Sequence, residues 1–189
     1  MSAQDSKLFV ISGPSGAGKG TLVTRVRERR SSLGLTVSAT TRAPRKGEVD
    51  GVNYFFLTRE EFDRRVANGE FVEWAEVHGN CYGTLVSEVQ SKLASGASLI
   101  LEIDVQGALQ VKERFPEAVL IFIKPPSLEV LRERLVGRGT ETPETIELRM
   151  ANAAHELALA DRYDDVVVND DLDRATDELV RVLDMHERI

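Results

Sequence analysis

A glycine-rich stretch near the N-terminus has the residue types of a phosphate-binding site. It consists of Gly13, Pro14, Ser15, Gly16, Ala17, Gly18, Lys19, Gly20 and Thr21. Glycines let backbone N–H groups wrap around an anion, and a helix that starts at the end of such a loop adds its dipole. Lys19 would place a positive charge on the β- and γ-phosphates of a nucleotide. The stretch therefore predicts a nucleoside triphosphate site to which all nine residues contribute.

The residue that follows the lysine departs from the usual form of this loop. That position normally carries a hydroxyl that contacts Mg²⁺. Here it is Gly20, and a hydroxyl comes one place later, at Thr21. We therefore name Thr21 as the candidate metal ligand. Either Thr21 takes over part of the metal coordination or the ion keeps an extra water. In both cases we expect phosphates and water to supply most of the Mg²⁺ ligands.

Two arginines further along the chain are spaced to bind a second phosphate. Arg42 and Arg45 flank the turn at Pro44. A proline stiffens a turn, so two guanidinium groups can converge on one phosphate and bind it bidentately. The simpler alternative is a solvated basic loop.

Three carboxylates lie at positions that indicate a specific role. Glu73 lies in the otherwise apolar stretch 71–75, where an ionised carboxylate is costly without hydrogen-bond donors; its alternative is an outward position on an edge strand. Glu102 and Asp104 follow an apolar run, and residues two apart on a strand project to the same side. We expect both to face a cleft, although Asp104 could instead be a helix N-cap.

Three arginines in the last third of the chain form a cationic set. Arg134 and Arg138 lie four residues apart near the end of a predicted helix. Arg149 borders the apolar face of the next helix, so it should lean into a cleft. Helix-surface ion pairs with Glu133 or Glu141 are the alternative.

The elements that would position these side chains alternate between strands and helices. Continuous apolar runs predict strands at 8–11, 99–103, 119–123 and 166–168. Helical patterns cover 19–30, 105–115, 127–138 and 172–189. This alternation is typical of an α/β fold, with a parallel sheet flanked by helices.

Two stretches interrupt this alternation and indicate inserts on a core. Residues 35–91 resemble a small mixed α/β insert with its own sheet, and they include a capping box at Thr58 and Glu61. Residues 127–163 resemble a helical lid, with Thr142 as N-cap and Pro143 in the first turn. The core is then formed by 1–34, 92–126 and 164–189.

Composition excludes several classes of protein. The chain has 189 residues and a formal net charge of −7, which argues against a nucleic-acid partner. A single cysteine and three scattered histidines exclude a disulfide framework and a metal site of the zinc-finger type. The longest apolar run, 118–123, is too short for a membrane span. We expect a cytoplasmic protein with no membrane partner and no obligate protein partner.

Several segments taken together resemble the guanylate kinases, in particular the bacterial ones. The resemblance extends from Leu8 to the last helix, with the motifs in the right order. They are the glycine-rich loop, 38–48 with Gly51 and Tyr54, 70–75, 79–84, 104–107, 137–141 and 168–172. The resemblance implies a nucleoside monophosphate kinase that transfers a phosphoryl group from ATP to GMP and requires Mg²⁺.

The resemblance also implies a role for individual residues. Arg42 and Arg45 would hold the GMP phosphate, assisted by the hydroxyls of Tyr54 and Tyr82. Glu73 would accept from guanine N1–H and N2–H, and Ser38 and Thr84 would donate to O6. Glu102 and Asp104 would orient the acceptor and contact Mg²⁺ through water. Arg134, Arg138 and Arg149 would close over the transferring phosphoryl group, and Asn169 would contact adenine. The catalytic set is thus Lys19, Arg42, Arg138 and Arg149.

Three alternatives stay open at this stage. An inactive guanylate-kinase-like binding module would keep the fold, but it should have lost parts of the glycine-rich loop or of the acceptor arginines. A kinase for another nucleoside monophosphate would share the loop. A regulatory nucleotide-binding protein without turnover is the third.

Overall fold

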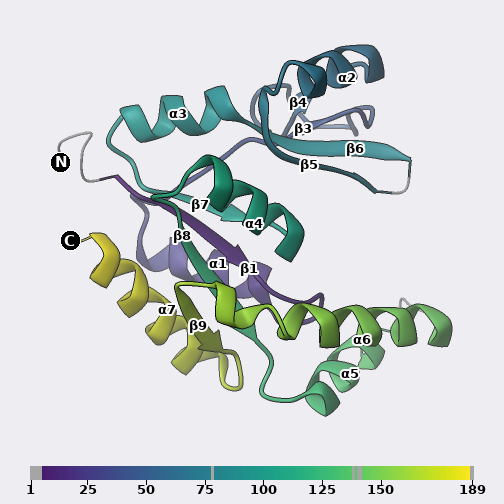
Figure 1. Ribbon diagram of the computed structural model, residues 1–189, viewed down its shortest axis with the longest axis vertical. Coiled ribbons are helices and arrows are strands. Elements are labelled where there is room, and N and C mark those ends of the chain that lie inside the picture. Colours follow the sequence, from purple (N-terminus) through teal and green to yellow (C-terminus); the bar gives the residue numbers. More distant parts are fainter. Residues whose placement is uncertain (1–5, 78, 138, 140–141, 188–189) are drawn as a thin grey trace.

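The computed structural model describes residues 6–77, 79–137, 139 and 142–187. Its centre is a five-stranded sheet in the order β2-β7-β1-β8-β9, in which every neighbouring pair is parallel. The strands are β2 (Gly34–Leu35), β7 (Leu99–Glu102), β1 (Leu8–Ser12), β8 (Val119–Lys124) and β9 (Asp165–Val168). The α/β class with a parallel sheet flanked by helices is confirmed (Figure 1).

Both faces of this sheet are covered by helices, which is why its strands are apolar throughout. One face packs on α1 (Lys19–Arg29) and α7 (Leu172–Glu187), with Phe9 and Ile121 among its buried side chains. The other packs on α3 (Val86–Ala94) and α4 (Val105–Arg114), with Val10 and Phe122 buried there. Figure 1 shows the two helical layers on opposite sides of β1 and β8.

A second, four-stranded sheet lies beside the core, in the order β4-β3-β6-β5. Its strands are β4 (Phe55–Phe56), β3 (Ala39–Thr40), β6 (Asn80–Leu85) and β5 (Phe71–Val77), and α2 (Arg59–Ala67) covers one face. That face contributes Ala39, Phe71, Cys81 and Leu85 to a small core around Phe62 of α2. Because side chains alternate between the faces of a strand, the other face is left for a ligand.

The helices α5 (Leu128–Gly137) and α6 (Pro143–Leu157) form a pair at the far end of the core from the second sheet (Figure 1). Leu131, Leu135 and Ala153 are buried between them, with Met150 packed alongside. A 3₁₀ turn, η1 (Ala160–Arg162), leads from α6 to β9. Of the described helices, none is long and apolar enough to cross a membrane.

The predicted element ends that fall on described residues are right to within one or two residues, and the helix ends predicted at 138 and 189 lie outside the described residues. Leu35, assigned to the insert, pairs with Ile100 at the edge of the core sheet. The strand expected to reach residue 103 ends at Glu102, because Asp104 already caps α4, which begins at Val105. Both predicted N-caps are confirmed, since the hydroxyls of Thr58 and Thr142 accept from backbone N–H groups three residues ahead. The division into core, insert and lid is not settled by these boundaries and stays a prediction.

Candidate active site

The glycine-rich loop connects β1 to α1, as its sequence predicts, and its glycines are required by its backbone. Gly13, Gly16 and Gly18 have φ of 140°, 91° and 89°, which L side chains rarely adopt. A Cβ at Gly18 would also lie 2.4 Å from Nδ2 of Asn169, and one at Gly13 would lie 2.3 Å from the carbonyl oxygen of Ile123. These positions therefore tolerate only glycine.

Lys19 is held against its own loop. Its Nζ donates to the carbonyl oxygens of Gly13 at 2.5 Å and Pro14 at 3.1 Å. The ammonium group thus lies inside the ring of the loop, where a phosphate chain would pass. Ala17 N–H donates to Pro14 O at 3.1 Å and closes the loop.

Two adjoining cavities share this loop. A cavity of about 300 Å³ is lined by Ser15, Lys19, Gly20, Thr21 and Glu102, among others. A second cavity, of about 480 Å³, is lined by Thr21 together with Arg134, Asn169, Asp170 and Leu172. Gly16, Gly18 and Thr21 line both cavities. An elongated ligand with a polar chain at one end and a larger group at the other would therefore fit along the loop.

Asn169 and Arg134 are brought together at the wall of the larger cavity. Asn169 is buried, and its side-chain Nδ2 donates to Ala17 O at 2.8 Å. Arg134 donates from Nη2 to the Asn169 carbonyl oxygen at 2.8 Å. Asn169 therefore braces the loop as well as lining the cavity, a bracing role that its position at a strand end did not reveal.

The remaining predicted arginines come from the two-helix region. Arg149 of α6 is half-buried and donates from Nη1 to the Ser15 hydroxyl. That contact brings the charge of Arg149 onto the glycine-rich loop. It agrees with the position of Arg149 beside the apolar face of its helix. Arg138, the third member of the set, lies outside the described residues.

Carboxylates approach the loop from the core sheet. Glu102 ends β7, and its Oε1 lies 3.4 Å from the place where Gly20 would carry a Cβ. Desolvation raises the pKa of the Glu102 carboxyl, and the charge of Lys19 opposes this shift. Among the described residues, no three His, Cys, Asp or Glu side chains gather to hold a metal. Oxygen donors suited to Mg²⁺ are nevertheless present in the Thr21 hydroxyl and the Glu102 carboxylate, since this ion prefers such donors and keeps several waters.

The second sheet brings the other predicted residues into one row. In its register Glu73 is opposite Thr84, and Ala39 is opposite both Gly83 and Phe55. Carried one residue back, the same register sets Ser38 beside Thr84 and Tyr54 beside Ser38. Side chains opposite each other share a face, so Glu73 and Thr84 lie together on the face away from α2. Ser38 and Tyr54 extend this row from the residues just before β3 and β4, where Ser38 O accepts from Phe55 N–H at 2.9 Å. Four residues that are far apart in the sequence thus lie together.

Glu73 is the charged member of this row. Its side chain is only 9% exposed, and the Thr84 hydroxyl donates to its Oε1 at 2.8 Å. Burial raises the pKa of the Glu73 carboxyl, the bond from Thr84 lowers it, and the charge of Asp104 raises it further. The hydroxyl has one proton to give, so a bond from Thr84 to a ligand would require that hydroxyl to rotate.

Asp104 lies at the junction of the two sheets and takes the helix-cap role. Its Oδ1 accepts from Gly107 N–H at 2.8 Å at the start of α4. A Cβ on Gly107 would lie 3.6 Å from the Cβ of Glu73, so this helix N-terminus abuts the row. One oxygen of Asp104 therefore caps α4, and the side chain stays exposed beside Glu73.

Arg42 is fixed by a carboxylate that the sequence reasoning missed. Glu48 Oε1 accepts from Arg42 Nη2 at 2.8 Å, and its Oε2 accepts from Arg45 N–H at 2.6 Å. This arrangement lowers the pKa of the Glu48 carboxyl, chiefly through the bond from Arg42. Glu48 follows Arg42 and Arg45 at intervals of three residues, a spacing that could have drawn attention to it.

Aromatic rings complete the surroundings of Arg42. Its guanidinium carbon lies 5.4 Å from the centre of the Tyr54 ring and 5.9 Å from that of Phe56. The Tyr82 and Tyr54 rings meet edge to face, with 6.2 Å between their centres. The pKa of Arg42 is raised chiefly by its bond to Glu48, and Tyr82 adds to this shift. Arg45 is exposed at the same turn. Arg42, Tyr54 and Tyr82 thus lie close together, and their role toward a phosphate stays a prediction.

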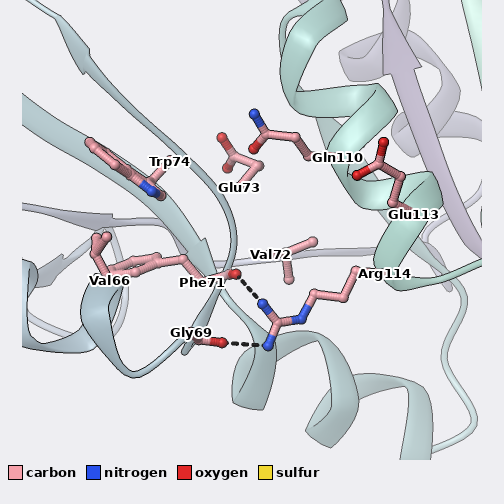
Figure 2. A pocket seen from close by; sticks show the side chains of 9 residues that line it. All are labelled: Val66, Gly69, Phe71, Val72, Glu73, Trp74, Gln110, Glu113 and Arg114. Atoms are coloured by element: carbon pink, nitrogen blue, oxygen red, sulfur yellow. Dashed lines mark hydrogen bonds between the residues drawn. The ribbon is translucent and has the colours of Figure 1, made fainter.

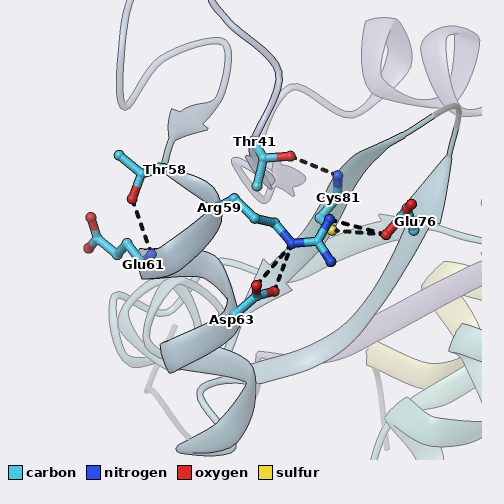
Figure 3. A network of polar contacts seen from close by, with 7 residues as sticks. All are labelled: Thr41, Thr58, Arg59, Glu61, Asp63, Glu76 and Cys81. Carbon is cyan, nitrogen blue, oxygen red and sulfur yellow. Dashed lines mark hydrogen bonds and ion pairs between the residues drawn. The ribbon is translucent and has the colours of Figure 1, made fainter.

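A polar network behind the sheet keeps this face in place. Arg59 of α2 donates to both oxygens of Asp63 at 3.0 Å and to Glu76 of β5 at 3.2 Å. On β6, Cys81 N–H donates to the Thr41 hydroxyl at 2.9 Å. Figure 3 shows these contacts on the side of the sheet that carries α2. They join α2 and the Thr41 turn to the β5–β6 hairpin.

Comparison with known proteins identifies relatives along nearly the whole chain. A family model described as "Guanylate kinase" matches residues 5–186. The guanylate kinase of Gloeobacter violaceus is 57% identical over 178 residues, which cover 94% of this chain and 87% of that protein. That of Halalkalibacterium halodurans is 51% identical over 183 residues, or 97% and 90% of the two chains. The crystal structure of guanylate kinase from Anaplasma phagocytophilum superposes with a TM-score of 0.72, at 36% identity, over 96% of this chain and 86% of that one.

Proposed function

The chain belongs to the guanylate kinase family and is an ATP:GMP phosphotransferase, and we propose that its second sheet binds GMP while its glycine-rich loop binds ATP. The observation that carries this division is the row formed by Tyr54, Ser38, Thr84 and Glu73 across the second sheet. Guanine offers two donors, N1–H and N2–H, on the edge that a carboxylate can accept. Adenine offers an acceptor at N1 and no 2-amino group.

On this proposal the buried Glu73 reads the guanine edge, and the hydroxyls of Ser38 and Thr84 donate to O6. The site of Arg42, Arg45, Tyr54 and Tyr82 holds the phosphate. Guanidinium groups bind phosphate in two-bond geometry and stay charged at all relevant pH values. Exposed Asp104 and Glu102 lie between the two ligands and would orient the acceptor phosphate.

The residues proposed to bind ATP supply positive charge and position its phosphates. Lys19 lies inside the loop and would track the β- and γ-phosphates, and Arg149, already on Ser15, would neutralise charge on the transferring group. We propose the same role for Arg134 and Arg138, and an adenine contact for Asn169. When bound, Mg²⁺ supplies charge neutralisation on the phosphates. Thr21 and Glu102 are the groups of this chain that would hold it, in part through water.

The acceptor in this reaction is already a phosphate anion, so the chemistry needs no strong general base. Catalysis then rests on holding two anionic groups in line and on excluding water that would hydrolyse ATP. A site of lysine and arginines without a catalytic histidine fits that requirement. We infer that the segments 35–91 and 127–163 move over the core to exclude water, and that the protein works in the cytoplasm.

A panel of acceptors tests this proposal. We expect kcat/KM for GMP to exceed that for AMP by about 10³ or more, because AMP would leave the buried Glu73 carboxylate without donors. The measurement is ADP release in a coupled assay with GMP, dGMP, AMP, UMP and CMP. Equal use of AMP and GMP would contradict the base-reading role of Glu73.

A further inference from the structure

One side chain of the core reaches across to the second sheet and binds its backbone twice. Arg114, in the last turn of α4, donates from Nη1 to the carbonyl oxygen of Phe71 at 2.8 Å. Its Nη2 donates to the carbonyl oxygen of Gly69. Figure 2 shows both bonds, with the guanidinium between the helix and the start of β5. The fork of an arginine suits two neighbouring carbonyls in a way that no other side chain does.

These two carbonyls belong to the turn that leads from α2 into β5. Gly69 has φ of 68°, its N–H donates to Val66 O at 2.9 Å, and Glu70 N–H donates to Arg65 O at 3.0 Å. Those two bonds form the Schellman ending of a helix, which directs the chain out of α2 at a fixed angle. Arg114 therefore holds the turn at the point where the chain enters the strand.

The strand changes register immediately afterwards. Phe71 is opposite Leu85 and Glu73 is opposite Thr84, so Val72 is an extra residue on β5. A bulge of this kind redirects side chains and is common next to active sites. Here Phe71 packs in the core of the insert, Val72 packs against the main core, and Glu73 joins the ligand row.

The two hydrogen bonds of Arg114 border a cavity. A cavity of about 420 Å³ lies between α4 and the start of β5, lined by Arg114, Gln110, Glu113 and Trp74 among others (Figure 2). The bulge is held in two ways. Val72 packs against the main core, and Arg114 binds the carbonyl oxygens of Gly69 and Phe71. A shorter side chain at 114 would leave those carbonyls facing the cavity.

We infer that Arg114 is a positioning residue for base recognition: it holds the bulged entry of β5 so that Glu73 is aimed at guanine. The inference rests on the proposed role of Glu73. It assigns to the far end of α4 a function in the acceptor site, which this helix also approaches at its capped N-terminus near Asp104. Arg114 acts on the backbone of this entry and is not among the residues proposed to contact either substrate.

The test compares Arg114→Ala and Arg114→Lys with Glu113→Ala, a control at the next residue of the same cavity. We expect Arg114→Ala to raise KM for GMP about fivefold, on the scale of one net hydrogen bond, with kcat and KM for ATP within twofold of wild type. The ratio of kcat/KM for GMP to that for AMP should fall by a similar factor. Lysine can serve one carbonyl, so Arg114→Lys should be intermediate, and Glu113→Ala should match wild type.

Thermal unfolding of each variant and a parallel Glu73→Gln variant separate the possible failures. If Glu73→Gln lowers the GMP:AMP ratio while Arg114→Ala leaves it unchanged, the positioning role is wrong and base reading by Glu73 stands. If Glu73→Gln also leaves the ratio unchanged, the proposed acceptor site fails and the inference with it. If Arg114→Ala lowers the unfolding temperature and raises both KM values together, Arg114 is a general stabiliser, and this too overturns the inference.

Discussion

The glycine-rich loop and the second sheet would bind their proposed ligands by different means. The loop uses backbone: three glycines with positive φ wrap a space into which Lys19 folds. The second sheet uses side chains, with Arg42 held by Glu48 and by two rings, and Glu73 held by Thr84. A backbone site is fixed once its strand and helix form, whereas a side-chain site depends on partners from other segments. Substitutions should therefore act on catalysis in the loop and on acceptor binding in the sheet.

The largest expected effect is in the loop. Lys19→Met keeps most of the side-chain stem but removes the charge that would follow the transferring phosphates. We predict that kcat falls at least about a hundredfold, while KM for GMP changes little. Steady-state rates on a variant with an unchanged circular dichroism spectrum provide the check. A kcat near that of wild type would show that the loop takes no part in phosphoryl transfer.

In the second sheet, Arg42→Ala should mainly affect the affinity for the acceptor. Loss of a charge-assisted bidentate contact predicts a rise in KM for GMP of about thirtyfold, with KM for ATP unchanged. Lys46→Ala, which removes an exposed charge from the same turn, is the matched control. If the control raises KM for GMP as much as Arg42→Ala does, the turn acts only through its net charge.

The raised pKa of the Glu73 carboxyl predicts opposite effects of pH on binding and on stability. The native protein holds the Glu73 proton to higher pH than the unfolded chain does. Its stability relative to Glu73→Gln should therefore fall as pH rises from the ordinary glutamate pKa through the raised one. Over the same window the carboxylate forms, so guanosine affinity should rise in wild type only. Guanosine is used because the phosphate of GMP titrates nearby. If guanosine affinity depends on pH in the same way in wild type and in Glu73→Gln, the Glu73 carboxylate does not recognise the base.

The smallest expected effect concerns Glu48. Glu48→Gln keeps the shape but removes the charge that pairs with Arg42, so the guanidinium should lose its fixed orientation. We expect KM for GMP to rise about fivefold, in keeping with a partly exposed ion pair, with kcat nearly constant. Glu60→Gln on the exposed start of α2 serves as control. A fall in KM for GMP would mean that Glu48 competes with the phosphate and does not position Arg42.

The loop could be predicted from sequence because its signal is local. Glycine at fixed spacing, a strand before it and a helix after it lie within about twenty residues, and all were identified. The caps at Thr58 and Thr142 were predictable for the same reason. Asp104 was ambiguous, because a residue after a strand can cap a helix or face a cleft, and its structure combines a cap with a place beside Glu73.

The existence of a second sheet was predictable from the sequence pattern, but the grouping of its site residues was predictable only through resemblance. No periodicity in the sequence sets Ser38 beside Thr84 or Glu73 beside Thr84, because strand register depends on long-range pairing. The bond from Glu48 to Arg42 and the bonds from Arg114 to β5 likewise join segments whose approach is set by tertiary packing. The bond from the Asn169 side chain to Ala17 spans 152 positions and could not be derived from the sequence around either residue.

The division of labour between the two regions can be tested directly by binding, without turnover. Isothermal titration of Lys19→Met and Arg42→Ala, each with GMP and with a non-hydrolysable ATP analogue plus Mg²⁺, gives four affinities to compare with wild type. The account predicts that Arg42→Ala loses GMP affinity and keeps that for the ATP analogue. It predicts that Lys19→Met keeps GMP affinity. If Arg42→Ala weakens both ligands equally, or Lys19→Met weakens GMP as strongly as Arg42→Ala does, the assignment of donor to loop and acceptor to sheet is contradicted.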